Sequence, residues 1–289
     1  MELENKKLSI RLLKYDYRLY NRIMLKETKT RIKAQFPLFY YLLQGMKREV
    51  TNRLMYPKLL TVELTKAKLT YQMIVTSIQE EVVVNGTYFE RDLIERILGL
   101  IKPGNVFLDV GAATGTHSIP LAMKCGSEGQ VYALEPDQEC SVVLKKNLTL
   151  NGLNNVSVLN VAAWNKDTAL ILNTNGASGH APQVEETIFQ NIEFKTHLPI
   201  SARSIESLVK SNDIRSPDIV KIDVEGKEYE VLQGMGDLKP KHIFVEVHPV
   251  MGVDLKKINE MMISKGYSII DQQNRVGEIH IYYSIIPPN

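Results

Sequence analysis

Ionisable side chains gather at the ends of two apolar runs in the second half of the sequence. In DIVKIDVEG, Lys221, Asp223 and Glu225 alternate along an otherwise apolar run, and in IFVEVHP, Glu246 precedes His248 by two residues. Charges in a buried strand are unfavourable unless they are paired or used. A carboxylate beside an imidazole can orient a general base, and the same atoms can bind a divalent cation. Asp223, Glu246 and His248 are therefore our candidate catalytic residues.

A glycine-containing turn precedes this cluster, in NVFLDVGAATGTHS. An apolar run ends at Asp109, and Gly111 and Gly115 then allow the backbone to pass close to a ligand. Ala113 stands where the dinucleotide-binding fingerprint requires glycine, which disfavours a pyrophosphate site. The spacing D-x-G-x-x-x-G is instead typical of proteins that bind S-adenosylmethionine.

An acidic residue ends the next apolar run, VYALEP. Glu135 lies 26 residues after Asp109, and an acidic side chain at this place accepts hydrogen bonds from ribose hydroxyls. Asn160 is expected near the adenine edge, and Trp164 either covers the ring or belongs to the core. The predicted cofactor-binding residues are Glu90, Asp109, Gly111, Ala112, Gly115, Thr116, His117, Glu135, Pro136, Asn160, Ala162, Ala163 and Asp223.

These motifs require a sheet whose strands end at one edge. From residue 105 apolar runs alternate with helical patterns, which predicts an α/β fold with a parallel sheet and helices on both faces. The expected central strands are NVFLDVG, QVYALEP, NVSVLNVAA, DIVKIDVEG and KHIFVEVHP. GYSIIDQQ and EIHIYYSII are expected to form a closing hairpin. Ligands of such sheets bind beyond the carboxyl ends of the strands, so adjacent strands should bring Asp223, Glu246 and His248 together.

In this order, the motifs NGTYFE, FLDVGAATGTHS, YALEP, VAAW, VKIDVEGKEYEVLQG and VEVH resemble the FkbM family of S-adenosylmethionine-dependent methyltransferases. The resemblance runs from about Gly86 to His248. It implies a class I methyltransferase (Rossmann-like) fold with a mostly parallel seven-stranded sheet. It also implies cofactor contacts at Asp109, Gly111, Glu135 and Asp223, with Glu90 as a further candidate, and methylation of hydroxyl groups on sugars, polyketides or related small molecules.

Three zones are expected along the chain. Residues 1–60 form a basic helical extension, with 14 Lys/Arg against 5 Asp/Glu, whereas the rest of the chain is acidic. This extension either packs on the main domain or contacts a membrane surface or an acidic partner. Residues 61–86 form a strand-rich connector in which YQMIVTSI and EEVVV are predicted strands and Asn85-Gly86 a turn. Residues 87–289 form the methyltransferase domain, beginning with a helix over 88–102 whose apolar face holds Leu93, Ile97 and Leu100.

Composition narrows the cellular context. Cys125 and Cys140 are the only cysteines, and both fall in expected core helices without metal-ligand spacing. The sequence has no apolar stretch of about 20 residues that could span a bilayer and no signal-peptide pattern. These observations favour a cytoplasmic protein.

Methyl transfer to an alcohol requires alignment of the acceptor and removal of its proton. We expect His248 to be the base, oriented by Glu246 or Asp223, and the acceptor to be a small molecule or glycan. A Mg²⁺ or Mn²⁺ ion on Asp223, Glu246 and His248 is an alternative, as is structural ion pairing. His117, His180 and His197 are weaker candidates for ligand contacts, and His242 and His280 are expected to be ordinary surface or sheet residues. Alternative functions are a nucleic-acid methyltransferase that uses the basic extension, which the acidic body disfavours, and a non-catalytic cofactor-binding scaffold.

Overall fold

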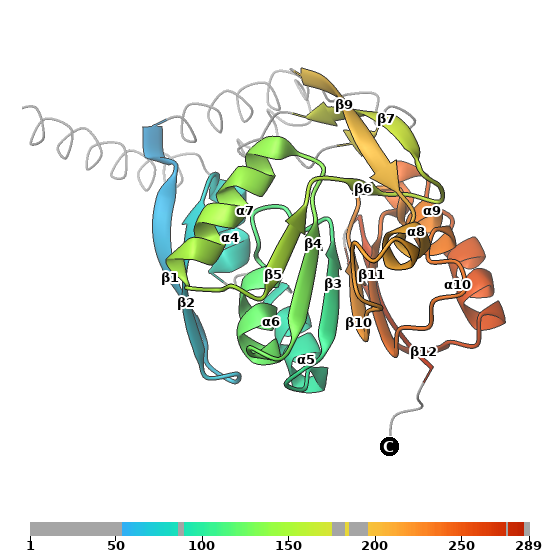
Figure 1. Cartoon of the computed structure of the whole chain (residues 1–289), viewed down its shortest axis with the longest axis horizontal. Helices are drawn as coiled ribbons and strands as arrows, with labels where there is room; N and C mark the ends of the chain where they lie inside the picture. The colour runs from blue at the N-terminus through green and yellow to red at the C-terminus, as the bar shows by residue number, and fades with distance from the viewer. Residues whose placement is uncertain (1–53, 86–89, 175–182, 185–195, 276, 286–289) are drawn as a thin grey trace, which may run out of the picture. The chain divides into compact units, whose positions relative to one another are not determined.

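The computed structural model describes residues 54–85, 90–174, 183–184, 196–275 and 277–285 (Figure 1). The chain divides into two compact units, Met1–Met55 and Tyr56–Asn289, and the description below concerns the second. Residues 1–53 of the expected basic extension lie outside the described residues, as does His180. Among the described residues, no helix combines the length and apolar character needed to cross a membrane.

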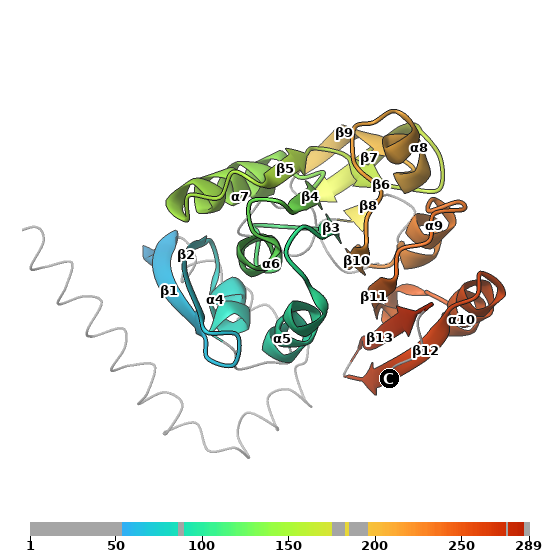
Figure 2. The same cartoon turned by 60° about the horizontal axis from the view of Figure 1, so that its bottom comes forward.

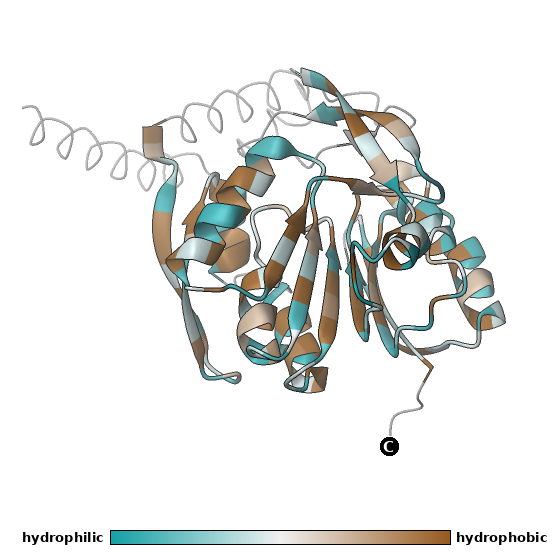
Figure 3. Ribbon diagram, in the orientation of Figure 1, coloured by the Kyte–Doolittle hydropathy of each residue, from teal (hydrophilic) through white to brown (hydrophobic). Residues whose placement is uncertain are grey.

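A seven-stranded sheet forms the centre of the unit, in the order β12-β13-β11-β10-β3-β4-β5. Four neighbouring pairs are parallel, and β13 is antiparallel to both β11 and β12. This confirms the predicted α/β class, the five central strands and the closing hairpin. Apolar residues predominate in β10 and β11 (Figure 3), as expected for strands covered on both faces. The strands are β3 (Val106–Val110), β4 (Gln130–Leu134), β5 (Val156–Leu159), β10 (Ile219–Ile222), β11 (His242–Val247), β12 (Ser268–Asn274) and β13 (Ile279–Ser284).

Helices cover the two faces of the sheet (Figure 2). One face carries α5 (Glu90–Leu100), α6 (Ser118–Cys125) and α7 (Gln138–Leu150), and the other carries α8 (Ile205–Lys210), α9 (Glu228–Gln233) and α10 (Leu255–Ser264). Because side chains alternate along a strand, Phe107 packs in the first core and Leu108 in the second. Cys125 and Cys140 are buried free thiols in α6 and α7, as predicted.

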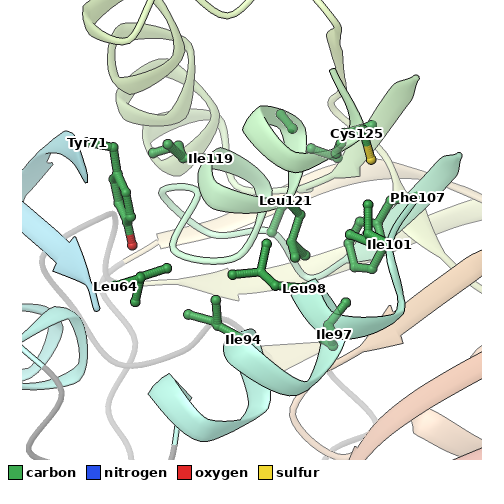
Figure 4. Packing of buried hydrophobic residues seen from close by; sticks show 14 of the residues in the cluster. Leu64, Tyr71, Ile94, Ile97, Leu98, Ile101, Phe107, Ile119, Leu121 and Cys125 are labelled. Carbon is green, nitrogen blue, oxygen red and sulfur yellow. The ribbon is translucent and has the colours of Figure 1, made fainter. Parts of the chain in front are cut away.

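The buried face of α5 differs from the predicted one. Ile94, Ile97 and Leu98 are buried, and they pack in the first core with residues of α6 such as Leu121 (Figure 4). Leu93 and Leu100 were expected on this face but are only half-buried. The core contacts α5 along a stripe rotated by about one residue from the predicted one.

A hairpin and a short helix precede α5. The hairpin consists of β1 (Lys58–Leu64) and β2 (Leu69–Val75), with its turn at residues 65–68. The expected strand YQMIVTSI is largely β2, but it pairs with β1, and the hairpin turn does not lie at Asn85-Gly86. The prediction of a strand at EEVVV is wrong, because this segment belongs to α4 (Ile78–Val84). The helix has an N-cap at Ser77, whose hydroxyl accepts a hydrogen bond from Glu80 N. The cap favours a helix at this point, whereas three valines favour a strand.

The stretch after β5 also contains strands. It forms a second, smaller sheet in the order β6-β9-β7-β8, made of β6 (Ala162–Ala163), β7 (Thr168–Thr174), β8 (Gln183–Val184) and β9 (Thr196–Arg203). The expected single strand NVSVLNVAA is therefore divided between β5 in the central sheet and β6 in this one. Residues 175–182 and 185–195 of the stretch lie outside the described residues.

Candidate active site

The glycine turn after β3 packs directly against the end of β10. Gly111 has a φ of +78°, and a Cβ at this position would lie 1.8 Å from the carbonyl oxygen of Asp223. Gly115 has a φ of +103°, and its Cβ would lie 2.5 Å from Leu144 Cδ1. Both glycines were expected to admit a ligand. The structure shows that they also permit close packing inside the protein, and that Gly111 brings the turn beside Asp223.

Glu135 holds the turn from the neighbouring strand. Its Oε2 accepts a hydrogen bond from Ala113 N at 2.8 Å, and its Oε1 accepts one from Asp137 N at 2.8 Å. Ala113 has a φ of +46°, which few residues other than glycine adopt. Burial raises the pKa of Glu135 to about 7, although the two N–H donors oppose this rise. Additional hydroxyl donors would stabilise its ionised form further.

The β1–β2 hairpin and α4 also contact the glycine turn, which the sequence analysis did not predict. The Thr114 hydroxyl donates to Glu80, which also accepts from Thr76 N at 2.5 Å. Asn147 on α7 donates to Thr114 O at 2.9 Å and exchanges hydrogen bonds with both backbone groups of Ile74 on β2. No local motif marks these residues, because they meet only when the hairpin packs on α7.

Lys221 lies at the centre of the site. Its Nζ donates to Gly111 O at 3.2 Å, donates to Asp223 Oδ2 at 3.4 Å, and lies 3.7 Å from Asp109 Oδ1. Burial disfavours its charge, but Asp223 and Asp109 outweigh this cost and raise the pKa of Lys221. Asp109 is fully buried and accepts a hydrogen bond from the Ser118 hydroxyl at 2.6 Å. A single ammonium group thus links the glycine turn with both carboxylates.

Glu90 and His117 face each other beside this group. Glu90 Oε2 lies 3.5 Å from His117 Nε2, and among the described residues neither atom has a hydrogen-bond partner. Burial raises the pKa of Glu90 to about 7, and it lowers that of His117 well below its usual value. Both residues were predicted to contact the cofactor. Their partnerless polar atoms are suited to a polar ligand at this place.

The structure brings the three predicted catalytic residues close together. One ligand-type atom from each of Asp223, Glu246 and His248 lies within 4.8 Å of the others. His248 Nδ1 lies 2.7 Å from Glu228 Oε1, and its Nε2 lies 3.6 Å from Glu225 Oε2 and 3.5 Å from Glu246 Oε1. Burial would lower the pKa of His248, but these carboxylates raise it to about 11. The imidazole is therefore cationic at neutral pH in this arrangement.

Sequence reasoning missed Glu228 and His280. The motif EGKEYE contains Glu228, and its spacing from His248 gives no sign that the two side chains meet. His280 was expected to be an ordinary sheet residue, but it is buried opposite Glu246, with its Nε2 3.1 Å from Glu246 Oε2. Arg275 Nη1 lies 2.9 Å from the same nitrogen. These contacts depend on the register of β13, which the sequence does not specify.

The predicted adenine-side residues lie after β5 and in β6. Asn160 donates its amide to Glu135 O at 2.7 Å and to Pro136 O at 3.0 Å, so it holds the turn after β4. A role in reading adenine stays a prediction. Ala162 and Ala163 are buried in β6, and Trp164 is buried with Lys227 Nζ 5.7 Å from its ring centroid. His197 lies in β9, where it contacts Asn173.

Metal ligation is the weaker explanation of the carboxylate and histidine groups. Asp223, Glu246 and His248 form one group with suitable spacing, and Glu246, Glu278 and His280 form another. However, Lys221 Nζ lies 3.4 Å from Asp223, and Arg275 lies against His280. Because a fixed cation contacts at least one candidate ligand in each group, ion pairing explains both groups better than a metal ion does.

The site suits a cationic ligand with hydroxyl groups. The buried oxygens Glu90 Oε2 and Asp109 Oδ1 have no hydrogen-bond partner among the described residues. Glu135 ends β4 beside the glycine turn, where ribose hydroxyls bind in related folds. S-adenosylmethionine carries a sulfonium, an ammonium group and a ribose. The residues present therefore fit this cofactor.

Comparisons with known proteins agree with this fit. Residues 109–269 match the family model described as Methyltransferase FkbM domain. The chain is 27% identical over 216 residues to the hexuronic acid methyltransferase AglP of Haloferax volcanii, covering 73% of this chain and 82% of that protein. It is 28% identical over 185 residues to a probable cobalt-precorrin-6B C(15)-methyltransferase (decarboxylating) of Sulfolobus acidocaldarius, covering 61% and 82%.

One similar solved structure is a SAM-dependent methyltransferase from Aquifex aeolicus, with 17% identity, a TM-score of 0.39, and coverage of 67% of this chain and 89% of that one. The family match spans more than half of the chain and includes the glycine turn, Glu135 and the candidate catalytic residues. The seven-stranded sheet has the expected class I topology. This chain therefore belongs to the FkbM family of S-adenosylmethionine-dependent methyltransferases.

Proposed function

We propose that this methyltransferase methylates a hydroxyl oxygen of a sugar or a comparable hydroxylated small molecule. The observation that carries the proposal is the cluster of Asp223, Glu246 and His248, which lies beside the glycine turn through the contact of Gly111 with Asp223. Such a cluster can accept the proton that an alcohol loses on methylation. The similarity to AglP, which acts on a hexuronic acid, also supports a sugar acceptor.

Two groups of the cluster are candidates for the base. His248 is the predicted one, but an imidazolium with a pKa of about 11 cannot accept a proton at neutral pH. When bound, S-adenosylmethionine supplies an electrophilic methyl group on a cationic sulfur. A positive charge near the same carboxylates lowers the pKa of His248. Asp223, whose pKa burial raises to about 6, is the second candidate and is largely ionised at pH 7.

Calorimetric titration with S-adenosylmethionine and S-adenosylhomocysteine tests the cofactor. Glu135→Ala is expected to weaken binding at least tenfold, about 1.4 kcal/mol, whereas Glu128→Ala, an exposed control, leaves it unchanged. Methyl transfer is then measured with a panel of methyl glycosides, by release of S-adenosylhomocysteine and by the mass of the product. A product methylated on oxygen supports the proposal. Cofactor binding without transfer to any hydroxyl acceptor contradicts it.

The two candidate bases are separated by kinetics. Loss of a general base lowers kcat by about 10²–10⁴-fold, so His248→Asn and Asp223→Asn are compared across pH 6 to 9. The base is the residue whose replacement removes the acidic limb of the kcat profile. If both variants retain that limb, neither residue is the base.

A further inference from the structure

A groove runs along one face of the sheet between α5 and the β12–β13 hairpin. It is open to solvent and is lined by residues of α5, β10, β11, β12 and β13. Tyr282 and Phe244 contribute apolar surface, with their rings stacked at a centroid distance of 4.4 Å. The polar residues that line the groove include Arg96, Lys221, Glu246, Asp271, Gln273 and Arg275.

The groove reaches the active site through residues that belong to both. Lys221 lines the groove, and its ammonium group donates to Gly111 O in the glycine turn. Glu246 also lines the groove, while its Oε1 lies 3.5 Å from His248 Nε2. A ligand in the groove would therefore adjoin both the cofactor turn and the groups that accept a proton.

Hydrogen-bond donors and acceptors alternate along the wall formed by β12 and the residue that follows it. Gln273 Nε2 donates to Asp271 Oδ2 at 3.1 Å, and Gln273 Oε1 accepts from Arg275 Nη2 at 3.4 Å. Arg96 on the opposite wall pairs with Asp271. A purely anionic or cationic ligand would match only half of these groups. These groups pair with one another, and a hydroxyl, which both donates and accepts, can exchange hydrogen bonds with either kind of group.

From this lining we propose that the groove is the acceptor site, that it binds a carbohydrate, and that Gln273 is a specificity-determining residue within it. The hydroxyl-rich edge of the sugar lies against Asp271, Gln273 and Arg275, and its C–H face lies on the Tyr282 side. This inference rests on the proposed function and adds the position and the contacts of the acceptor.

Neighbouring glutamines on β12 provide a matched test. Gln273 lines the groove, whereas Gln272 is exposed and is not among the groove residues. We would measure binding of methyl glycosides of hexoses and hexuronic acids by saturation-transfer NMR with S-adenosylhomocysteine present, and turnover with S-adenosylmethionine. Gln273→Ala should raise the KM for the sugar at least tenfold and leave the Kd for the cofactor unchanged. Gln272→Ala should change neither.

The possible outcomes separate this inference from the proposed function. Turnover of a sugar with an unchanged KM in Gln273→Ala would overturn the groove as acceptor site and leave the proposed function intact. Sugar binding that Gln273→Ala abolishes, without any turnover, would support the groove and contradict the proposed function. The absence of both sugar binding and turnover, with the cofactor bound, would overturn both.

Discussion

His280 Nε2 lies 3.1 Å from Glu246 Oε2, directly across the antiparallel pair β11–β13. The other oxygen of Glu246 faces His248 at 3.5 Å, so a single carboxylate lies between two imidazoles. Burial would raise the pKa of Glu246, but the neighbouring imidazoles of His248 and His280 lower it well below its usual value. Glu246 therefore remains ionised and is suited to orienting its neighbours rather than to accepting a proton.

Replacement of Lys221 by methionine is expected to destabilise the protein strongly. The variant would leave Asp109 and Asp223 without their common cation, and loss of one partner from a buried ion pair costs about 3–5 kcal/mol. Lys241→Met is the control, because Lys241 is exposed and pairs with Asp218 at 3.5 Å, where the cost is about 1 kcal/mol or less. Denaturant unfolding measures both. Equal losses would show that Lys221 does not neutralise the buried carboxylates.

Gly111→Ala is expected to disrupt the contact between the glycine turn and the end of β10. The added Cβ would lie 1.8 Å from Asp223 O. Gly104→Ala is matched to it, since Gly104 also has a positive φ, of +87°, but no atom within 4 Å of an added Cβ. The control should cost about 1–2 kcal/mol, and Gly111→Ala clearly more, as measured by melting temperature. Similar melting temperatures for the two variants would contradict this close packing.

Asn147→Ala is expected to weaken cofactor binding through the turn. Asn147 contacts both Ile74 and Thr114, and each buried backbone group left without a partner costs about 1–3 kcal/mol. Asn151 makes the same pair of bonds to the backbone of Gln72, away from the turn. Both alanine variants should lower stability, but only Asn147→Ala should raise the Kd for S-adenosylhomocysteine, measured by calorimetry. An equal Kd in both variants would mean that the hairpin contact does not position the turn.

Stability is expected to fall as the pH rises through the neutral range. Burial and the charge of Asp223 raise the pKa of Glu225 to about 8, and the carboxylates around His248 raise its pKa to about 11. A group with a raised pKa stabilises the folded state fully below its unfolded pKa, and this stabilisation is lost as the pH rises through the folded pKa. The stabilisation from Glu225 is therefore lost between about pH 4.5 and 8, and the loss from His248 begins near pH 6.5.

Melting temperatures from pH 5 to 9 test this expectation. Glu225→Gln should flatten the decline between pH 5 and 8, because the amide does not titrate. The cationic cofactor should bind more tightly at pH 8 than at pH 6, since more carboxylates are then ionised. A melting temperature that rises over this range in the unmodified protein would contradict the assignment.

The sequence alone determined the central architecture and much of the site. Apolar runs separated by helical patterns indicated the parallel sheet, and the spacing of Asp109, Gly111 and Gly115 indicated the cofactor turn. Parallel strands end at one edge of a sheet, so Asp223, Glu246 and His248 could be placed together before any contact was known. These inferences rest on local periodicity and on a general rule of sheet topology.

Tertiary structure decided the remaining contacts. His280 meets Glu246 because of the register of an antiparallel pair, and Asn147 meets Ile74 because a hairpin outside the family match packs on α7. The helix α4 is a different case, because its Ser77 cap is a local contact whose spacing to Glu80 is a start signal readable from the sequence. Local sequence encodes periodicity and propensity, whereas strand register and the packing of distant segments depend on side chains that meet only in the folded chain.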